Sequence, residues 1–272
     1  MEQEIDIIDI RKLVNTIKSV YGFDFGEYAL SSFKRRLARI IEVYKFANMT
    51  EVIEKVRVDK PFYELFLKEV TVNTTEMFRD PSMWKKLKET VFPVVKDYST
   101  IRIWHSACST GEEVYSMAIA LKEAGLYDKA RIFASDINED VIAKALEGKY
   151  PARNMELNGF NYEKFEGKLK LNNYFKSTGD YVFMDQDLLR NVTFRKFDLV
   201  QGEQTMRFDI ILCRNVLIYF NLPLQDQIVG KFAKCTSQGG FLALGSKETI
   251  AWCKSVENYN TFSLEEKIYQ RK

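Results

Sequence analysis

Two adjacent carboxylates, Glu112 and Glu113, follow a run of small residues at positions 107–111. Residues 101–106 have the β-branched and aromatic side chains typical of a strand, and residues 114–121 form an apolar run long enough for a buried helix. A strand, a turn of small residues and a helix start form the first unit of a nucleotide-binding α/β sheet. The N–H groups at a helix start attract phosphate, and carboxylates placed there compete with it. The two acids therefore favour a ligand with a positive centre and no phosphate.

S-adenosylmethionine is the ligand that fits this requirement best. A nicotinamide dinucleotide, and with it an oxidoreductase, is disfavoured because its pyrophosphate would face two carboxylates. Helix capping is a second interpretation of the acids, since Ser109 and Glu112 have the spacing of a capping box, worth on the order of 1 kcal/mol. Both interpretations hold if one acid caps the helix and the other faces the ligand, and the sequence leaves open which does which.

A third acid, Asp136, ends the apolar stretch 131–137. It comes about 25 residues after Gly111, slightly later than the acid that binds ribose hydroxyls in dinucleotide folds, at roughly 20 residues after the glycine-rich turn. The alternative role, capping the next helix, suits Asn138 better. We therefore expect Asp136 to bind a ribose.

Further polar residues follow the most apolar stretch, 208–213, which has the pattern of a strand buried on both faces. Arg214 and Asn215 come directly after it, where open α/β sheets bind ligands, although a loop arginine in a salt bridge is the plainer interpretation. Tyr219 could close over a methyl donor or pack in the core. His105 lies within the first expected strand, and we interpret it as a packing residue.

The elements that must position these residues fall into two parts. Residues 1 to about 70 have apolar side chains at helical spacing and no strand pattern, which predicts a small helical domain. Strands and helices alternate from residue 101 onward, with an irregular insertion between 149 and 192. Within and after it we expect turns at 157–160, 177–180 and 238–240, a short strand at 181–184, and a closing antiparallel pair over 261–269. By composition alone, 69–79 is a linker.

Bulk properties exclude several classes of protein. The chain has 272 residues, a net charge of +2, four scattered cysteines and one histidine. Near-neutral charge gives no indication of nucleic-acid binding, and no apolar run reaches the roughly 18 residues that span a bilayer. Cysteines without CxxC spacing indicate reduced thiols in a cytoplasmic protein, so we expect neither disulfides nor a metal site.

Several segments, in order along nearly the whole chain, resemble the CheR-type chemotaxis receptor methyltransferases. The matching segments are 73–80 (NTTEMFRD), 103–104 with 107–116 (ACSTGEEVYS), 134–137 (ASDI), 208–220 (FDIILCRNVLIYF) and 239–248 (GGFLALGSKE), with 22–24 and 33–37 in the helical part. The resemblance implies a Rossmann-like class I methyltransferase sheet, an N-terminal all-helical domain at 1–72, a cofactor-lid segment at 73–90, and a catalytic domain at 91–272 with a small β-subdomain insertion around 150–192. It replaces the linker interpretation of 73–79.

The resemblance also implies a function. It is methylation of glutamate side chains on methyl-accepting chemotaxis receptors, with S-adenosylmethionine as donor; a non-catalytic, cofactor-binding receptor module of the same fold is the alternative. Arg79 and Tyr219 are the candidates for aligning the incoming carboxylate or shielding the methyl group. The implied cofactor contacts are Asn73, Thr75, Arg79, Ala107, Ser109, Glu112, Asp136, Ile137, Asp198, Leu199, Arg214 and Asn215.

Four positions depart from the family pattern. Ala107 stands where glycine is common, Val114 where proline is usual, His105 where a small residue is usual, and Asp198 where asparagine is common. None removes a charge needed for the cofactor, so we expect binding to survive. The cytoplasmic domain of the receptor is the expected partner. A solvated cluster of basic residues could dock it: Lys34, Arg35, Arg36 and Arg39.

Overall fold

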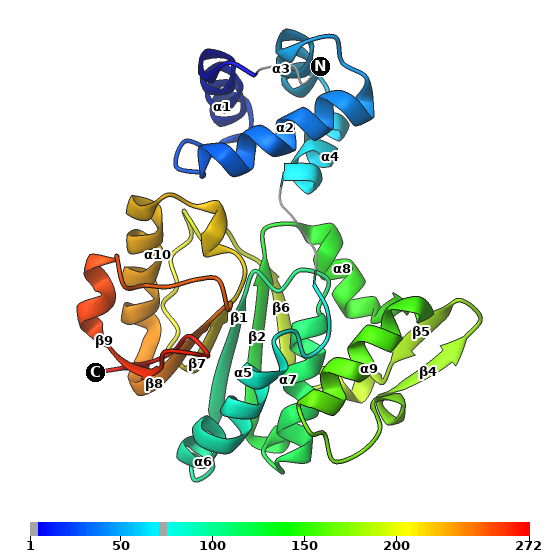
Figure 1. The fold of residues 1–272 in the computed structure, drawn as a ribbon, viewed down its shortest axis with the longest axis vertical. Helices are drawn as coiled ribbons and strands as arrows, with labels where there is room; N and C mark the ends of the chain where they lie inside the picture. Colours follow the sequence, from blue (N-terminus) through cyan, green and yellow to red (C-terminus); the bar gives the residue numbers. More distant parts are fainter. Residues whose placement is uncertain (1–4, 71–74) are drawn as a thin grey trace. The chain divides into compact units, whose positions relative to one another are not determined.

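The structure, a computed structural model, describes residues 5–70 and 75–272. The chain divides into two compact units (Figure 1). The smaller unit comprises the described residues of Met1–Asn73 together with Ile218–Leu224, and the larger comprises those of Thr74–Leu217 and Gln225–Lys272.

The smaller unit is helical, as its apolar periodicity predicts. Its helices are α1 (Ile7–Tyr21), α2 (Leu30–Tyr44), α3 (Met49–Val58) and α4 (Lys60–Val70). Acidic and amide side chains cap three of their starts: Asp6 accepts from the N–H of Ile8, Asn48 from that of Glu51, and Asp59 from that of Phe62. The apolar faces meet in a core whose fully buried members include Leu13, Ile17, Leu37, Val52 and Phe66.

A short segment from much later in the chain completes this unit. Tyr28 forms an isolated antiparallel bridge with Phe220. On either side of it, the N–H of Ala29 donates to the carbonyl of Tyr219 at 2.8 Å, and the N–H of Asn221 donates to the carbonyl of Glu27 at 2.9 Å. Tyr219 therefore lies in a segment that belongs to the helical unit.

The larger unit is built on a seven-stranded sheet with the order β6-β2-β1-β7-β8-β10-β9. Its strands are β1 (Ile101–Ser106), β2 (Ala130–Asp136), β6 (Val192–Lys196), β7 (Phe208–Cys213), β8 (Thr236–Leu244), β9 (Tyr259–Ser263) and β10 (Ile268–Arg271). The first five in the order pair in parallel, and β10 is antiparallel to both β8 and β9. The expected closing antiparallel pair is confirmed.

Helices cover both faces of this sheet (Figure 1). They are α5 (Pro81–Lys86), which continues through a π-helical turn (Leu87–Val91) into α6 (Phe92–Val95), then α7 (Glu112–Glu123), α8 (Glu139–Glu147) and α10 (Leu222–Cys235). Successive side chains of β1 point to opposite faces. Ile103 belongs to the core formed with α5, α6 and α7, whereas Trp104 meets Phe232 of α10 with ring centroids 5.5 Å apart.

The insertion contains a three-stranded antiparallel sheet of order β3-β5-β4: β3 (Lys149–Pro151), β4 (Phe175–Thr178) and β5 (Tyr181–Met184). It also contains a helix that the sequence did not predict, α9 (Met155–Lys164). The turn expected at 157–160 is wrong, because these residues lie inside α9. Tertiary contacts outweigh the local turn preference: buried Asn158 and Asn161 of α9 hydrogen-bond the backbone of Met77.

The turn expected at 238–240 is also wrong, because it lies inside β8. The register of β8 against β7 shifts between the pairs Phe208–Thr236 and Ile210–Phe241, so the strand accommodates these residues as an irregularity rather than as a connection. All four cysteines are buried, free thiols. In 5–70 and 75–272, no helix is long and apolar enough to cross a bilayer, and no group of His, Cys, Asp or Glu has the arrangement to hold a metal ion.

Candidate functional site

The turn between β1 and α7 has an unusual backbone. Ala107, Ser109 and Gly111 all have positive φ angles, of 59°, 49° and 92°. A left-handed backbone costs a non-glycine residue roughly 1–2 kcal/mol, a cost that both Ala107 and Ser109 carry in this turn. Gly111 has a second constraint, because a Cβ there would lie 2.6 Å from the Cβ of Ala145 on α8. The turn is thus packed tightly against its neighbouring helix.

The predicted capping box does not form. The N-cap of α7 is Gly111, which has no side chain, and the hydroxyl of Ser109 is buried without a partner among the described residues. The Glu112 side chain instead accepts a hydrogen bond from the Thr110 hydroxyl at 2.7 Å. The helix begins at Glu112, so Ser109 precedes the N-cap by two positions, which the sequence spacing alone could not show.

Glu112 is an acid buried without a counter-ion. It is 6 % exposed, and among the described residues no Lys or Arg forms an ion pair with it. Burial raises its pKa to about 7, although the Thr110 hydrogen bond and, more weakly, the charge of Lys144 oppose the shift. A cation brought to this carboxylate would recover the cost of burying it.

Asp136 lies at the end of β2, beside the turn. Its carboxylate accepts from the N–H of Ser109 at 2.9 Å and from the N–H of Asn138 at 3.0 Å, while Asn138 caps α8 through the N–H of Asp140. Burial raises its pKa, against the lowering effect of these backbone donors. Each carboxylate oxygen has two lone pairs, so acceptor capacity for ribose hydroxyls remains.

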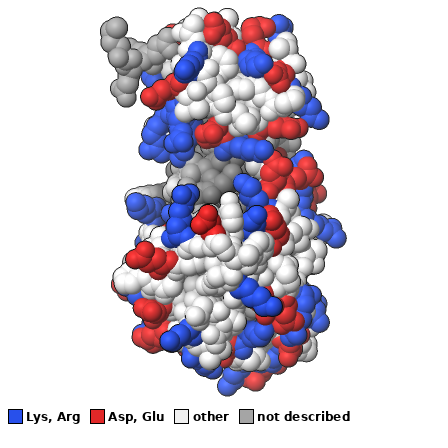
Figure 2. Space-filling model, turned by 90° about the vertical axis from the view of Figure 1, so that its right-hand side faces the viewer, with Lys and Arg blue, Asp and Glu red and all other residues white. Residues whose placement is uncertain are grey.

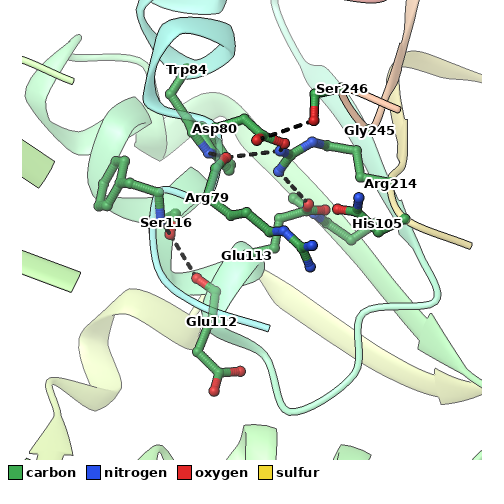
Figure 3. A network of polar contacts seen from close by, with 12 residues as sticks. Arg79, Asp80, Trp84, His105, Glu112, Glu113, Ser116, Arg214, Gly245 and Ser246 are labelled. Atoms are coloured by element: carbon green, nitrogen blue, oxygen red, sulfur yellow. Dashed lines mark hydrogen bonds and ion pairs between the residues drawn. The ribbon is translucent and has the colours of Figure 1, made fainter. Parts of the chain in front are cut away.

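Glu113 points in a different direction from Glu112 (Figure 3). One of its oxygens lies 2.8 Å from Nδ1 of His105, and the other accepts from Nη1 of Arg214 at 2.9 Å. Burial alone would raise the pKa of Glu113, but the His105 hydrogen bond and the Arg214 charge outweigh it and lower the pKa. His105 is fully buried, as a packing residue should be, yet it also has this polar partner.

Arg214 connects Glu113 to the segment that precedes α5 (Figure 3). Its Nη2 donates to the Asp80 carboxylate at 2.7 Å and to the carbonyl of Arg79 at 2.8 Å. We call His105, Glu113, Arg214 and Asp80 the Arg214 cluster. The salt-bridge interpretation of Arg214 is therefore correct, and its guanidinium lies within the protein with a side chain 2 % exposed.

Residues 75–80 lie against α7 and α9. The N–H of Phe78 donates to the Ser116 hydroxyl at 2.9 Å, and that hydroxyl donates to the carbonyl of Glu112 at 2.7 Å. The carbonyl of Arg79 also accepts from the indole N–H of Trp84 at 3.0 Å. Thr75 is half-buried, and Asn73 lies outside the described residues.

The loop after β6 is organised by a lysine that the sequence did not single out. Asp198 accepts from the N–H groups of Val200 and Gln201, at 2.8 and 3.1 Å, so its carboxylate shapes the loop that begins with Leu199. Lys231 of α10 donates to the carbonyls of Leu199, Val200 and Gly202. Burial lowers the pKa of Lys231.

Glu248 is a second organising residue that sequence reasoning did not assign. Its carboxylate accepts from the N–H groups of Asn215, Val216 and Gly245, at 2.8, 2.8 and 2.7 Å. A Cβ at Gly245 would lie 2.7 Å from the side-chain nitrogen (Nδ2) of Asn215, so only glycine fits at this position without a shift of its neighbours. Glu248 lies in segment 239–248, one of the segments that resemble the CheR-type methyltransferases, so the resemblance could have pointed to it.

Most sequence-predicted residues thus gather at the carboxyl ends of β1, β2, β6 and β7, with 75–80 from the segment before α5. These are Thr75, Arg79, Ala107, Ser109, Glu112, Asp136, Ile137, Asp198, Leu199, Arg214 and Asn215. This edge is where open α/β sheets bind ligands. The uncompensated carboxylate of Glu112, the unpartnered hydroxyl of Ser109 and the acid ending β2 suit a nucleoside with a cationic amino-acid portion.

Fold and site together define a class I methyltransferase that uses S-adenosylmethionine. Family models match almost the entire chain: the all-alpha domain of CheR methyltransferases matches residues 8–71, and the SAM-binding domain matches residues 73–267. The chain belongs to the CheR methyltransferase family.

Individual relatives agree with this assignment. The chain is 33% identical over 264 residues to "Putative methyltransferase Cher3" of Pseudomonas putida, with 97% of each chain covered. It is 30% identical over 244 residues to the "Chemotaxis protein methyltransferase" of Listeria monocytogenes, covering 89% of this chain and 90% of the relative. It is also 30% identical to the protein of that name in Borreliella burgdorferi, with 92% and 90% covered.

Proposed function

We propose that this protein methylates glutamate side chains on the cytoplasmic domain of methyl-accepting chemotaxis receptors, giving glutamate methyl esters and S-adenosylhomocysteine. The observation that carries the proposal is the buried carboxylate of Glu112, which forms no ion pair among the described residues, at the start of α7 and one strand away from Asp136. Relatives of nearly full-length coverage are named chemotaxis protein methyltransferases. The carboxylate supports S-adenosylmethionine as the methyl donor, and the relatives' names support a substrate in chemotaxis.

The cofactor roles follow from charge and position. Glu112 would hold the methionyl ammonium, and Asp136 with Ile137 the ribose. Asp198 and Leu199 would flank the adenine on the loop that Lys231 orders. The remaining cofactor contacts would come from Asn73, Thr75, Arg79 and the backbone at Ala107 and Ser109. Arg214 and Asn215 would complete the pocket.

Little acid–base chemistry is required of the protein. S-adenosylmethionine, when bound, supplies an electrophilic methyl group to a nucleophile. A receptor glutamate, with a reference pKa near 4.3, is already ionised at neutral pH, so no base is needed. The protein contributes by excluding water and orienting the carboxylate, and orientation by itself can lower a barrier by several kcal/mol. Arg79 and Tyr219 are our candidates for aligning the carboxylate or shielding the methyl group.

Methyl transfer to a purified receptor cytoplasmic domain tests the function. With methyl-labelled S-adenosylmethionine, we expect label on the receptor that base releases as methanol. Asp136→Asn should reduce it, whereas Glu139→Gln, an exposed change on α8, should not. Binding of S-adenosylhomocysteine without any ester would instead favour the non-catalytic receptor module. Arg79→Ala and Tyr219→Phe test the alignment roles: full turnover by both at saturating cofactor would refute them.

Receptor docking is a separate part of the proposal. Arg35 and Arg39 are exposed on α2, Lys34 and Arg36 are half-buried, and Arg39 lies 3.8 Å from Glu69. On the face that Figure 2 shows, positive and negative side chains are interspersed on each unit. Charge reversal at these four α2 residues should raise the KM for receptor. The matched control is reversal of Arg11 and Lys12, two exposed residues of α1. Unchanged methylation of receptor by the α2 variant would refute docking there.

A further inference from the structure

The segment that leads into α5 is held in a strained conformation. Phe78 and Asp80 have φ angles of 53° and 56°, in the left-handed region that non-glycine residues rarely adopt. Such residues cost of order 1–3 kcal/mol each and persist only where surrounding contacts fix them. Arg79, a predicted cofactor and substrate contact, lies between them. The conformation of this short segment therefore decides where the Arg79 side chain is placed.

Arg214 supplies the contacts that fix the second half of this segment. It bonds both the carbonyl of Arg79 and the carboxylate of Asp80. Asp80 precedes α5, yet its side chain makes no capping hydrogen bond to that helix. Asp80 bonds Arg214 and, at 3.3 Å, Ser246 instead. The capping interaction normally expected of this aspartate is given up for a contact with Arg214.

Glu113 in turn fixes Arg214. The two are 101 positions apart in sequence, and their ion pair is almost completely buried. His105 occupies the other carboxylate oxygen of Glu113, so the carboxylate is held from two directions (Figure 3). The Nδ1 atom of His105 is the hydrogen-bond donor in this contact, because an ionised carboxylate can only accept.

We infer that Glu113, oriented by His105, is a positioning residue of the methyl-donor site: it acts through Arg214 to hold residues 78–80 in the strained conformation that places Arg79. The inference rests on the cofactor site of the proposed function and extends it to two residues with no assigned role. It is independent of which protein accepts the methyl group.

A double-mutant cycle on binding of S-adenosylhomocysteine to the full chain tests the inference. Glu113→Gln keeps the size of the side chain and removes its charge. We expect it to weaken binding about tenfold or more, because an uncharged side chain no longer holds the buried guanidinium of Arg214 in place. In an Arg214→Met background the same change should have little further effect, because Glu113 acts through Arg214. An undiminished effect in that background would overturn the inference, as would wild-type affinity of Glu113→Gln.

Hydrogen exchange separates positioning from a general loss of stability. Glu113→Gln should accelerate exchange of the peptide that covers 76–80 while β7 stays as protected as in the wild type. Asp80→Asn, which weakens the same contact without touching Glu113, should reproduce this pattern and provides the test if Arg214→Met does not fold. If exchange becomes faster throughout the protein, or does not become faster at 76–80, Glu113 only stabilises the fold.

Variants of His105 provide a rescue test. His105→Leu removes the donor to Glu113 and should weaken binding as Glu113→Gln does, whereas His105→Asn keeps an N–H donor and should retain more affinity. Equal affinities for the two variants would refute the orienting role of His105. A wild-type protein that does not bind S-adenosylhomocysteine would refute the proposed cofactor site itself, which is a different result from either of these.

Discussion

Replacing Glu112 by glutamine should make the ligand-free protein more stable and the cofactor complex weaker. The folded protein buries this carboxylate without a counter-ion among the described residues, and burial raises its pKa from 4.5 to about 7. The folded state therefore keeps a proton between pH 4.5 and 7 that the unfolded chain releases. The stability cost of Glu112 grows as the pH rises through this window and is complete above it.

The shift sets the size of the effect. About 2.5 pKa units at 1.36 kcal/mol each give about 3 kcal/mol as an upper estimate of the cost. Glu112→Gln should thus raise stability by less than about 1 kcal/mol at pH 5 and by up to about 3 kcal/mol at pH 8, or several degrees in Tm. The Thr110 hydroxyl can donate to the new amide oxygen, so the local hydrogen bond is retained.

Binding should change in the opposite direction. A carboxylate that holds an ammonium group must be ionised, so with a pKa of about 7 the wild-type affinity for S-adenosylhomocysteine should rise roughly twentyfold between pH 5.5 and 7.5. Glu112→Gln should bind more weakly and lose this dependence. Thermal unfolding and calorimetry at several pH values, with Glu147→Gln on the exposed side of α8 as control, measure both effects. Equal stabilisation at pH 5 and pH 8, or wild-type affinity at pH 7.5, would refute the reasoning.

Three further predictions concern the turn and the adenine loop. Ala107→Gly should raise the free energy of unfolding by up to about 1 kcal/mol in denaturant titrations, because glycine tolerates the positive φ; a loss of stability would contradict this. Gly111→Ala should lower it by about 2 kcal/mol or more through strain and the contact with Ala145, and a neutral result would show that the turn is looser than described. Lys231→Met should weaken binding of S-adenosylhomocysteine about fivefold or more as three carbonyls lose their donor, each such bond being worth about 1 kcal/mol; unchanged affinity would remove the loop from the site.

Local patterns explain why much of the fold could be predicted. The helical domain is recognisable because apolar side chains recur at helical spacing, and the buried core of the helical unit is built from them. The strand 208–213 is recognisable because every one of its residues is buried and nearly all are apolar. These signals act within a few residues, so they can be read without knowledge of the rest of the chain.

Local patterns failed where a distant contact outweighed them. Residues 157–160 have the composition of a turn, yet they are helical because the asparagines of α9 bond the backbone of Met77, more than eighty positions earlier. The spacing of Ser109 and Glu112 fits a capping box, yet α7 begins at Glu112 with Gly111 as its N-cap, so Ser109 lies too early in the chain to cap it. Tyr219 follows β7 closely in sequence, but it belongs with the helical unit through its contact with Ala29.

The two acids after the small-residue turn show where sequence ends and structure begins. The sequence by itself determined that a strand, a turn and a helix would bring Glu112 and Glu113 to the ligand edge of an α/β sheet, because that placement depends on periodicity and spacing alone. Only the tertiary structure decided that Glu113 is neutralised by Arg214 and His105 while Glu112 is buried without a counter-ion among the described residues. Neighbouring positions on a helix differ by about 100° in direction, so the roles of two adjacent, chemically identical side chains depend on which partners the fold brings to each side.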